Sequence, residues 1–286
     1  ERGYIYESIF KKIGLVPVRE TCVDTLNTDT YMPYIKVLYL PEGYTLTVDF
    51  AVYTTQQPSL FFVAPNQYVN IEKCGPSEGF LIFYNRDFYC IQIHDHEVAC
   101  DGLLFNNIHN IPLVTVNQED ISFMVYLFQQ MKEEFEVRDP SLEEMMRTYL
   151  KQLLIKATRM WKQQHLENTA VNQNSDVEFF RKFTRLVDAH YKDKHTVADY
   201  ADVLSMAAKT VTHKFIRLNL PQPNEVIKNR IILEAKRLLV HTSMTAKEIA
   251  HELGYEDPAY FSRQFLVKTG ETPSGFRTKY IGATNV

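Results

Sequence analysis

One pattern occurs twice in the last third of the chain: a short helix, a tight turn and a second helix. In the clearer copy, residues 245–265, the first helix is predicted by the apolar stripe of Ile249, Ala250 and Leu253. Ala250 is small enough for another helix to cross closely. Gly254 follows where the chain has to leave this helix, because glycine tolerates the left-handed backbone of a helix end. The pattern restricts this part of the chain to an all-helical fold.

The second helix of this copy has a clear start. Asp257 is predicted to cap it and Pro258 to occupy its first position. Phe261 and Phe265, four residues apart, turn its apolar face toward the first helix. An ordinary helical hairpin without a ligand is the alternative. The short, polar or amphipathic side chains left outside suit contacts with a groove of DNA: Ala259, Tyr260, Ser262, Arg263 and Gln264.

A fainter copy lies 49 residues earlier, and this recurrence gives it weight. Its predicted anchors are Val197, Tyr200, Ala201 and Leu204 on the first helix and Val211 and Phe215 on the second. Met206 is expected to fill the corner between the helices. The side chains expected on the outside are Lys209, Thr210, Thr212, His213 and Lys214.

Residues 224–240 separate the two copies and are expected to form one helix, which begins after Pro221 and Pro223. About 17 residues at 1.5 Å each give a rod of roughly 25 Å. A rod of that length is able to hold two helices near the ~34 Å spacing of successive major grooves on one face of DNA.

Residues 177–279 resemble the DNA-binding domain of the AraC/XylS transcription regulators. The motifs that carry the resemblance are residues 230–239, Ile249-Ala250-x-x-Leu253-Gly254-Tyr255, Phe261-Ser262-Arg263-x-Phe265 and residues 270–277. The resemblance implies seven helices, two helix-turn-helix units and double-stranded promoter DNA as a partner. This chain has Ala207 where the family often has Ser, and His213 where it often has Arg. We therefore expect fewer or different base contacts from the first unit, made by Lys209, Thr210, Thr212 and His213.

The charge is divided unevenly along the chain. From Asp176 onward it carries 17 Lys and Arg against 13 Asp and Glu, a balance of +4 within a total of −4. A modest positive balance supports phosphate contacts without demanding them. The motifs, not the charge, therefore decide the expectation of DNA binding.

The first half is β-rich and broken by turn signals. The apolar runs are residues 34–40, 44–50, 59–63, 68–71 and 79–84. Short strands at this spacing predict an antiparallel barrel or sandwich. Regulators of the AraC type commonly carry a cupin-like β-barrel here that binds a small effector, so the fold class expected for the whole chain is α+β with two domains.

Polar and aromatic residues in and before these runs are candidates for the effector pocket, and a sugar is one candidate ligand. The alternative is that they are packing or surface residues. The candidates are Arg19, Tyr39, Thr47, Asp49, Tyr53 and Tyr68.

Residues 94–97, with His109 downstream, are a candidate metal site, because two His one residue apart on a strand face the same way. Glu97 is adjacent to the second His and would face the opposite side, so we expect no metal and no cofactor. Cys22, Cys74, Cys90 and Cys100 lack a paired CxxC spacing and are expected to be free thiols.

Two helices are expected between the halves, over residues 120–137 and 141–161. The apolar stripe of the second either packs against the barrel or forms a homodimer interface, as in many members of the family. The candidate interface residues are Leu142, Met146, Tyr149, Leu153 and Met160. The polar residues that follow predict domains at 1–167 and 177–286, joined by a linker at 168–176.

We therefore expect a DNA-binding transcription regulator rather than an enzyme, an activator that contacts RNA polymerase, dimerises and responds to a small molecule. A dimeric regulator without an effector is one alternative, and a metal-dependent cupin enzyme fused to a DNA-binding domain is another. No apolar run approaches the roughly 20 residues of a membrane span, and no signal-peptide pattern opens the chain. The expected location is the bacterial cytoplasm, at the nucleoid.

Overall fold

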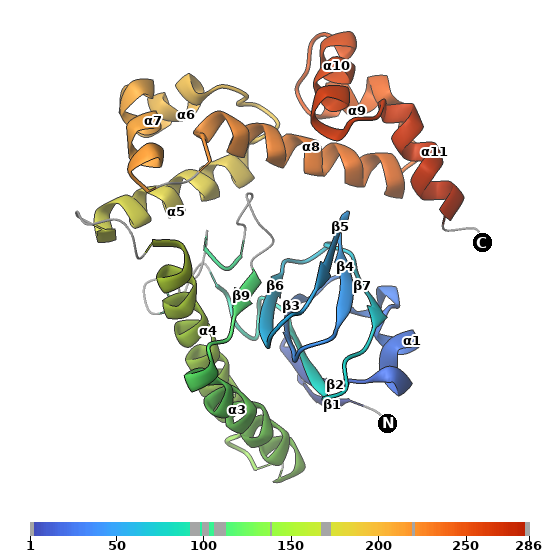
Figure 1. Cartoon of the computed structure of the whole chain (residues 1–286), viewed down its shortest axis with the longest axis vertical. Helices are drawn as coiled ribbons and strands as arrows, with labels where there is room; N and C mark the ends of the chain where they lie inside the picture. Colours follow the sequence, from blue (N-terminus) through green and yellow to red (C-terminus); the bar gives the residue numbers. More distant parts are fainter. Residues whose placement is uncertain are drawn as a thin grey trace. The chain divides into compact units, whose positions relative to one another are not determined.

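The computed structural model describes residues 3–91, 98, 103–105, 113–137, 139–166, 173–218 and 221–283. The chain forms two compact units, Glu1–Asn168 and Thr169–Val286, coloured from blue to green and from yellow to red in Figure 1. The first unit is β-rich with a pair of helices, and the second is helical. The α+β class expected from the sequence is thus observed.

The larger sheet of the first unit is antiparallel throughout. Its strands lie in the order β1 (Tyr4–Glu7), β2 (Lys12–Val18), β8 (Gly79–Tyr84), β3 (Ile35–Leu40), β6 (Ser59–Val63) and β9 (Leu113–Thr115). In the centre, Leu38 lies opposite Leu81 on one side and Phe61 on the other. This register brings three apolar side chains to the same face, where they begin the core.

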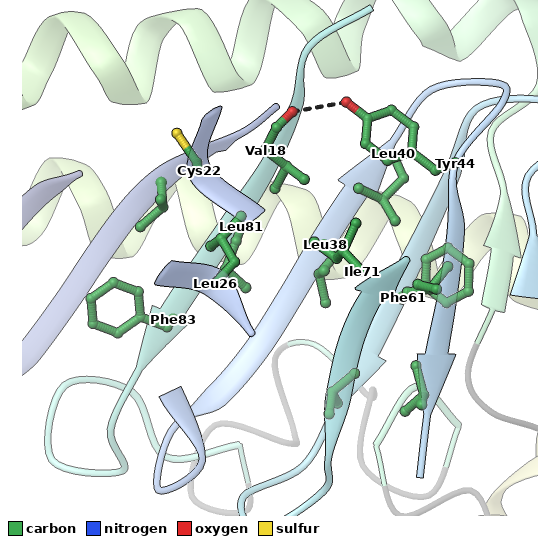
Figure 2. Close-up of a cluster of buried hydrophobic side chains, with 14 residues drawn as sticks. Val18, Cys22, Leu26, Leu38, Leu40, Tyr44, Phe61, Ile71, Leu81 and Phe83 are labelled. Atoms are coloured by element: carbon green, nitrogen blue, oxygen red, sulfur yellow. Dashed lines mark hydrogen bonds between the residues drawn. The ribbon is translucent and has the colours of Figure 1, made fainter. Parts of the chain in front are cut away.

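The smaller sheet has three antiparallel strands in the order β5 (Ala51–Thr54), β4 (Thr45–Val48) and β7 (Val69–Lys73). Apolar residues from both sheets, with Leu26 of the short helix α1 (Val23–Leu26), form one buried cluster. Figure 2 shows this cluster, with Leu38 and Leu81 of the larger sheet beside Ile71 of β7. The core of the unit therefore lies between the two sheets.

The expected β-barrel does not close. Within the described residues, no strand of the larger sheet forms a ladder with a strand of the smaller one. After β3, the turn at Gly43, whose φ is 93°, leads the chain into the smaller sheet. The sheets are joined there by the hydroxyl of Tyr44, which donates to the Val18 carbonyl (2.8 Å) and accepts from the Gly79 amide (3.0 Å). The prediction of short antiparallel strands is confirmed, and their closure into a barrel is wrong.

Two long helices follow, α3 (Gln118–Val137) and α4 (Leu142–Leu166), and they pack against each other. Phe128 of α3 stacks on Tyr39 and Phe80 of the larger sheet, with ring centroids 5.3 and 5.1 Å apart. Of the five candidate dimerisation residues on α4, Leu142, Met146, Leu153 and Met160 are buried inside the unit and Tyr149 is half-buried. The apolar stripe thus packs within one copy of the chain, and these four side chains cannot supply an exposed dimer interface.

The second unit contains seven helices in its described part. They are α5 (Gln173–His190), α6 (Val197–Val203), α7 (Ala208–Arg217), α8 (Pro223–His241), α9 (Ala246–Glu252), α10 (Pro258–Thr269) and α11 (Pro273–Ala283). Helix α5 starts within the segment expected to be a linker. The rod expected between the two copies is confirmed as α8, and its 19 residues give a length of about 28 Å.

Helix α8 contacts α6 and α7 of the first helix pair and α9 of the second, and Glu225 near its start pairs with Lys268 of α10. Its buried Arg230 donates to Asp188 of α5 (2.7 Å) and to Glu234 one turn later (2.9 Å). The guanidinium also lies 3.8 Å from the ring centroid of Tyr191. Because a planar guanidinium pairs with carboxylates and aromatic faces together, this one residue fixes α8 against α5.

The turns of the two helix pairs have the same backbone hydrogen bonds, 49 residues apart. Met206 N donates to Ala201 O in the first, and Tyr255 N donates to Ala250 O in the second, both at 2.9 Å. Each turn passes through a left-handed residue, Ser205 with φ 53° and Gly254 with φ 78°. The sequence repeat is therefore a repeat of backbone geometry. The prediction that Met206 fills the corner is wrong, because its side chain is exposed.

Replacing Gly254 with Ala is expected to destabilise the second unit by about 2–4 kcal/mol, from left-handed strain and a steric clash together. An added Cβ would lie 1.9 Å from the Lys192 carbonyl oxygen. Gly270 is the matched control, since its φ is also 78° but a Cβ there meets no atom within 4 Å. Gly270→Ala should cost about 1–2 kcal/mol.

Native-state hydrogen exchange of backbone amides in residues 223–265 measures both variants in the full chain. Equal losses of protection in the two variants would contradict the role assigned to the contact between Gly254 and Lys192.

Candidate nucleic-acid interface

Helix α10 has one buried face and one exposed face. Asp257 caps its start by accepting the Ala259 amide (2.8 Å), as predicted. Phe261 and Phe265 are fully buried on the inner face. The geometry expected for this helix is thus observed. On the outer side Ala259, Tyr260 and Arg263 are exposed, while Ser262 and Gln264 are half-buried.

Arg263 is the one basic residue among the α10 side chains expected at the interface. Its side chain is 67% exposed, and its guanidinium lies 3.7 Å from the carboxylate of Asp257, which is also exposed. A loose exposed ion pair of this kind contributes at most ~1 kcal/mol, so the guanidinium can exchange it for a base edge or a phosphate at little cost.

A chain of hydrogen bonds runs from the buried turn to the exposed face of α10. The Tyr255 hydroxyl donates to Oε1 of Gln264 (3.2 Å), and Nε2 of Gln264 donates to the Tyr260 hydroxyl (2.6 Å). Burial raises the pKa of Tyr255 to about 12, so its hydroxyl keeps the proton that it donates. The amide of Gln264 is thereby held in one orientation, with its oxygen toward the turn and its nitrogen toward the surface.

Two hydroxyls at the predicted interface are bonded to their own helices. Ser262 donates to the Pro258 carbonyl (2.9 Å) and Thr212 to the Ala208 carbonyl (3.1 Å). A hydroxyl bonded in this way still has lone pairs to offer, so these residues are suited to accept hydrogen bonds rather than to donate them.

Helix α7 exposes Lys209, Thr210 and His213, as predicted, with Thr212 half-buried. Its first residue follows Ala207, whose side chain makes no capping bond. The start of α7 therefore has no side-chain cap, as expected from Ala at this position. Lys214, expected on the outside, is half-buried and donates to the carboxylate of Asp176 (2.8 Å).

Asp176 was not singled out in the sequence. It is 2% exposed, and besides Lys214 it pairs with Arg217, so the last turn of α7 is tied to the first turns of α5. Nothing in the linear pattern pairs a residue at the edge of a polar segment with two basic residues about 40 positions later.

The capping boxes of both pairs were also missed. Thr196 with Asp199 starts α6, and Thr245 with Glu248 starts α9. A Thr followed three residues later by an acidic residue is a known start signal, so this feature was accessible to sequence reasoning. The two boxes also lie 49 residues apart, as the repeat requires.

The candidate effector residues do not form one site. Arg19 pairs with Glu78 (3.1 Å), Tyr39 stacks on Phe128, Thr47 bonds Glu72, and the ring of Tyr53 packs on Phe61. Tyr68 lines a pocket of the first unit, and Asp49 accepts the Tyr68 amide (3.1 Å). These last two therefore lie at or beside this pocket.

The candidate metal site, residues 94–97 with His109, lies outside the described residues, as does Cys100. The described part of the chain holds no cluster of three or more His, Cys, Asp or Glu placed to bind a metal ion. Cys22, Cys74 and Cys90 are free thiols. No helix among the described residues has the length and apolar character required to cross a membrane.

Residues 200–279 match a family model described as a helix-turn-helix domain. HTH-type transcriptional activator Btr of Bacillus subtilis is 33% identical over 82 residues, 29% of this chain and 16% of that protein. HTH-type transcriptional regulator ExsA of Pseudomonas aeruginosa is 29% identical over 104 residues, 36% of each protein. The match therefore spans little more than a third of these relatives, and less in Btr.

Two solved structures are similar in outline. The DNA-binding domain of AdpA, in complex with a target DNA, is 21% identical with a TM-score of 0.34, and the match covers 36% of this chain and 94% of that one. ToxT from Vibrio cholerae, with an unsaturated fatty acid bound, is 15% identical with a TM-score of 0.42, and the match covers 97% and 98%.

The helical unit thus contains a helix-turn-helix DNA-binding domain, and the two relatives above are named as transcription regulators. In this domain the chain is similar to the AraC/XylS regulators, whose motifs it carries.

Tyr255→Phe is expected to change which bases are selected opposite Gln264, because the ring stays and only the hydroxyl that orients the amide is lost. Stability should fall by about 1 kcal/mol. Selection from randomised duplexes measures the effect as broadened preference at the affected position.

Tyr200→Phe is the matched control, since the Tyr200 hydroxyl bonds the Lys194 carbonyl (3.0 Å) in the other helix pair. It should lose similar stability and keep the preference at that position. An unchanged profile for Tyr255→Phe would show that the hydrogen-bond chain does not orient Gln264 for reading.

Proposed function

We propose that this chain is a sequence-specific activator that reads two adjacent major grooves with its second unit and responds to a small molecule bound in its first. The observation that carries the DNA-reading part is the repeated helix pair. Both pairs have the same turn, both present a polar helix face, and both pack on α8.

The length of α8 supports a side-by-side placement. A helix of about 28 Å between the pairs is of the same order as the ~34 Å between successive major grooves on one face of DNA. In the proposed complex α10 and α7 enter the two grooves, and their exposed side chains contact base edges. Lys209 of α7 and Lys247 of α9 are exposed and suited to contact phosphates.

The two helix pairs are expected to contribute unequally. The outer face of α10 combines Arg263, which can make two hydrogen bonds to one base, with Gln264, whose amide nitrogen is oriented toward the surface as a donor. The outer face of α7 offers Lys209 and His213 without a capping hydroxyl. We propose that α10 supplies most of the sequence preference and that α7 supplies mainly affinity.

The first unit is proposed to dimerise and to bind the effector, so that effector and DNA affinities are linked reciprocally. Because the apolar stripe of α4 is buried, the dimer contact has to use other residues. RNA polymerase is the partner expected of an activator. A dimeric regulator without an effector is the second candidate, and it is favoured by the scattered positions of the six effector candidates.

Arg263→Ala tests the DNA-reading role. Loss of a base contact should weaken binding to the selected duplex by about 1–3 kcal/mol, or roughly 5- to 150-fold. Fluorescence anisotropy at fixed salt, with selected and scrambled duplexes, measures the ratio of affinities, which should fall.

The matched control is Lys279→Ala, which removes one positive charge from α11 at an exposed position outside both pairs. Its ratio should stay as in the unaltered chain. If Arg263→Ala kept that ratio too, Arg263 would not be a reading residue.

A further inference from the structure

The most exposed large apolar residue described in the second unit is Val267 of α10, whose exposed fraction is 84%. Valine is an unfavourable choice for such a position, because its branched side chain lowers helix propensity and its methyl groups stay in water. Residues that break a local rule in this way tend to mark functional sites. The folding of α10 alone therefore does not explain Val267.

The last turn of α10 is held in place. Lys268, the residue after Val267, pairs with Glu225 of α8. The helix ends at Gly270, whose amide donates to the Leu266 carbonyl (2.8 Å) and whose φ is 78°. The Val267 side chain thus projects from a fixed turn of the helix and not from a frayed end.

Val267 lies on the outer face of α10. It comes four residues after Arg263 and seven after Tyr260, and residues at these intervals share one side of a helix. Tyr260 and Arg263 are exposed as well, whereas the buried Phe261 and Phe265 define the opposite face. The surface that is proposed to enter the DNA groove therefore continues to Val267.

The spacing of the residues on this face suits base reading. In homeodomains, which are helix-turn-helix variants, the recognition helix contacts the major groove with side chains at positions i, i+3, i+4 and i+7. Tyr260, Arg263, Gln264 and Val267 have the same spacing. Four residues of helix rise about 6 Å, the length of about two base-pair steps. Val267 is therefore within reach of a base about two positions from the one that Arg263 contacts.

We propose that Val267 is a specificity-determining residue that recognises the 5-methyl group of a thymine in the major groove. Thymine alone among the four bases presents a methyl group there, and apolar side chains are its usual partners. The other bases present hydrogen-bond donors and acceptors, which a valine would leave without partners. This assignment rests on the proposed function and extends its DNA contacts to a side chain that makes no hydrogen bond.

The sequence repeat supports the assignment. Phe215 of α7 corresponds to Phe265 of α10, so the residue that corresponds to Val267 is Arg217. The Arg217 guanidinium is tied to the carboxylate of Asp176. The first helix pair thus has a paired cation at the position where the second has an exposed isopropyl group. This difference fits the proposed division, in which α7 supplies mainly affinity and α10 supplies most of the sequence preference.

A protein partner is the other class of molecule that is able to cover Val267. Val267 and Arg263 are neighbours on the helix surface, one turn apart, so a protein that buried Val267 would also obstruct Arg263. The loose ion pair of Arg263 with Asp257 leaves that guanidinium able to contact DNA. The shared face therefore favours DNA as the occupant.

Replacement of single thymines by deoxyuridine tests the proposal, because it removes the 5-methyl group and leaves every hydrogen bond of the base pair. The full chain is first used to select a duplex, and the preference lost in Arg263→Ala identifies the base pair that Arg263 reads. At one thymine within about two base pairs of that position, on either strand, loss of the methyl group should weaken binding about fourfold. Fluorescence anisotropy at fixed salt measures the affinity for each substituted duplex.

Val267→Ala should remove this methyl effect. The variant should bind the selected duplex about fourfold more weakly than the unaltered chain, and should bind the thymine and deoxyuridine duplexes equally well, because the two groups form one contact. Alanine favours a helix more than valine does, so the melting temperature should not fall. Val137→Ala is the matched control, an exposed valine of α3 in the first unit, and should keep the full methyl effect.

The proposal is overturned if no thymine shows a methyl effect that is lost in Val267→Ala. Unchanged DNA affinity of Val267→Ala, together with weaker activation of a promoter that carries the selected site, would also overturn it and would assign Val267 to a protein partner. A selected duplex without this methyl effect leaves the reading role of Arg263 intact. Failure of the unaltered chain to select any duplex would instead contradict the proposed function itself, and this assignment with it.

Discussion

Both helix pairs depend on α8, and α8 depends on the buried guanidinium of Arg230. One planar cation holds Asp188 of α5, Glu234 of its own helix and the ring of Tyr191. Removal of one partner from such a group leaves an uncompensated buried charge, which is strongly destabilising. The group therefore fixes where α8 runs, and the two pairs inherit their separation and relative orientation from it.

The two units use buried charge in different ways. In the second unit Asp176 and Arg230 are each matched by opposite charges, and the result is rigidity. In the first unit Lys36 is held by carbonyl oxygens. A rigid reading domain suits DNA, because its contacts have to keep their spacing.

Local signals in the sequence predicted most of the second unit. The N-cap Asp257, the left-handed Gly254 and the paired Phe261 and Phe265 are each set by neighbours in the chain, and each was found where expected. The exposure of the Met206 side chain was not predictable in this way. The turns at Met206 and Tyr255 have the same backbone geometry. Whether the side chain at this position fills the corner between the two helices depends on contacts with residues distant in the sequence.

The first unit was predicted less well because its features depend on distant contacts. Alternation along β3 shows that Lys36 and Leu38 share a face of the strand. It does not show that both faces of this strand are buried. The closure of the two sheets into a barrel was wrongly predicted for the same reason, because the pattern of each strand does not show which strand edges of the two sheets pair. The apolar stripe of α4 is equally consistent with packing inside the unit and with a dimer interface. Its burial and the contact of α4 with α3 show that it packs inside the unit.

We propose that one copy of the chain reads two neighbouring grooves from one rigid support. Hydroxyl-radical footprinting of the full chain on a selected duplex measures this directly. The structure predicts two protected stretches per copy on one face of the DNA, centred about one helical turn (~10 base pairs) apart. A single protected stretch per copy, or protection spread evenly over unrelated sequences, would contradict it.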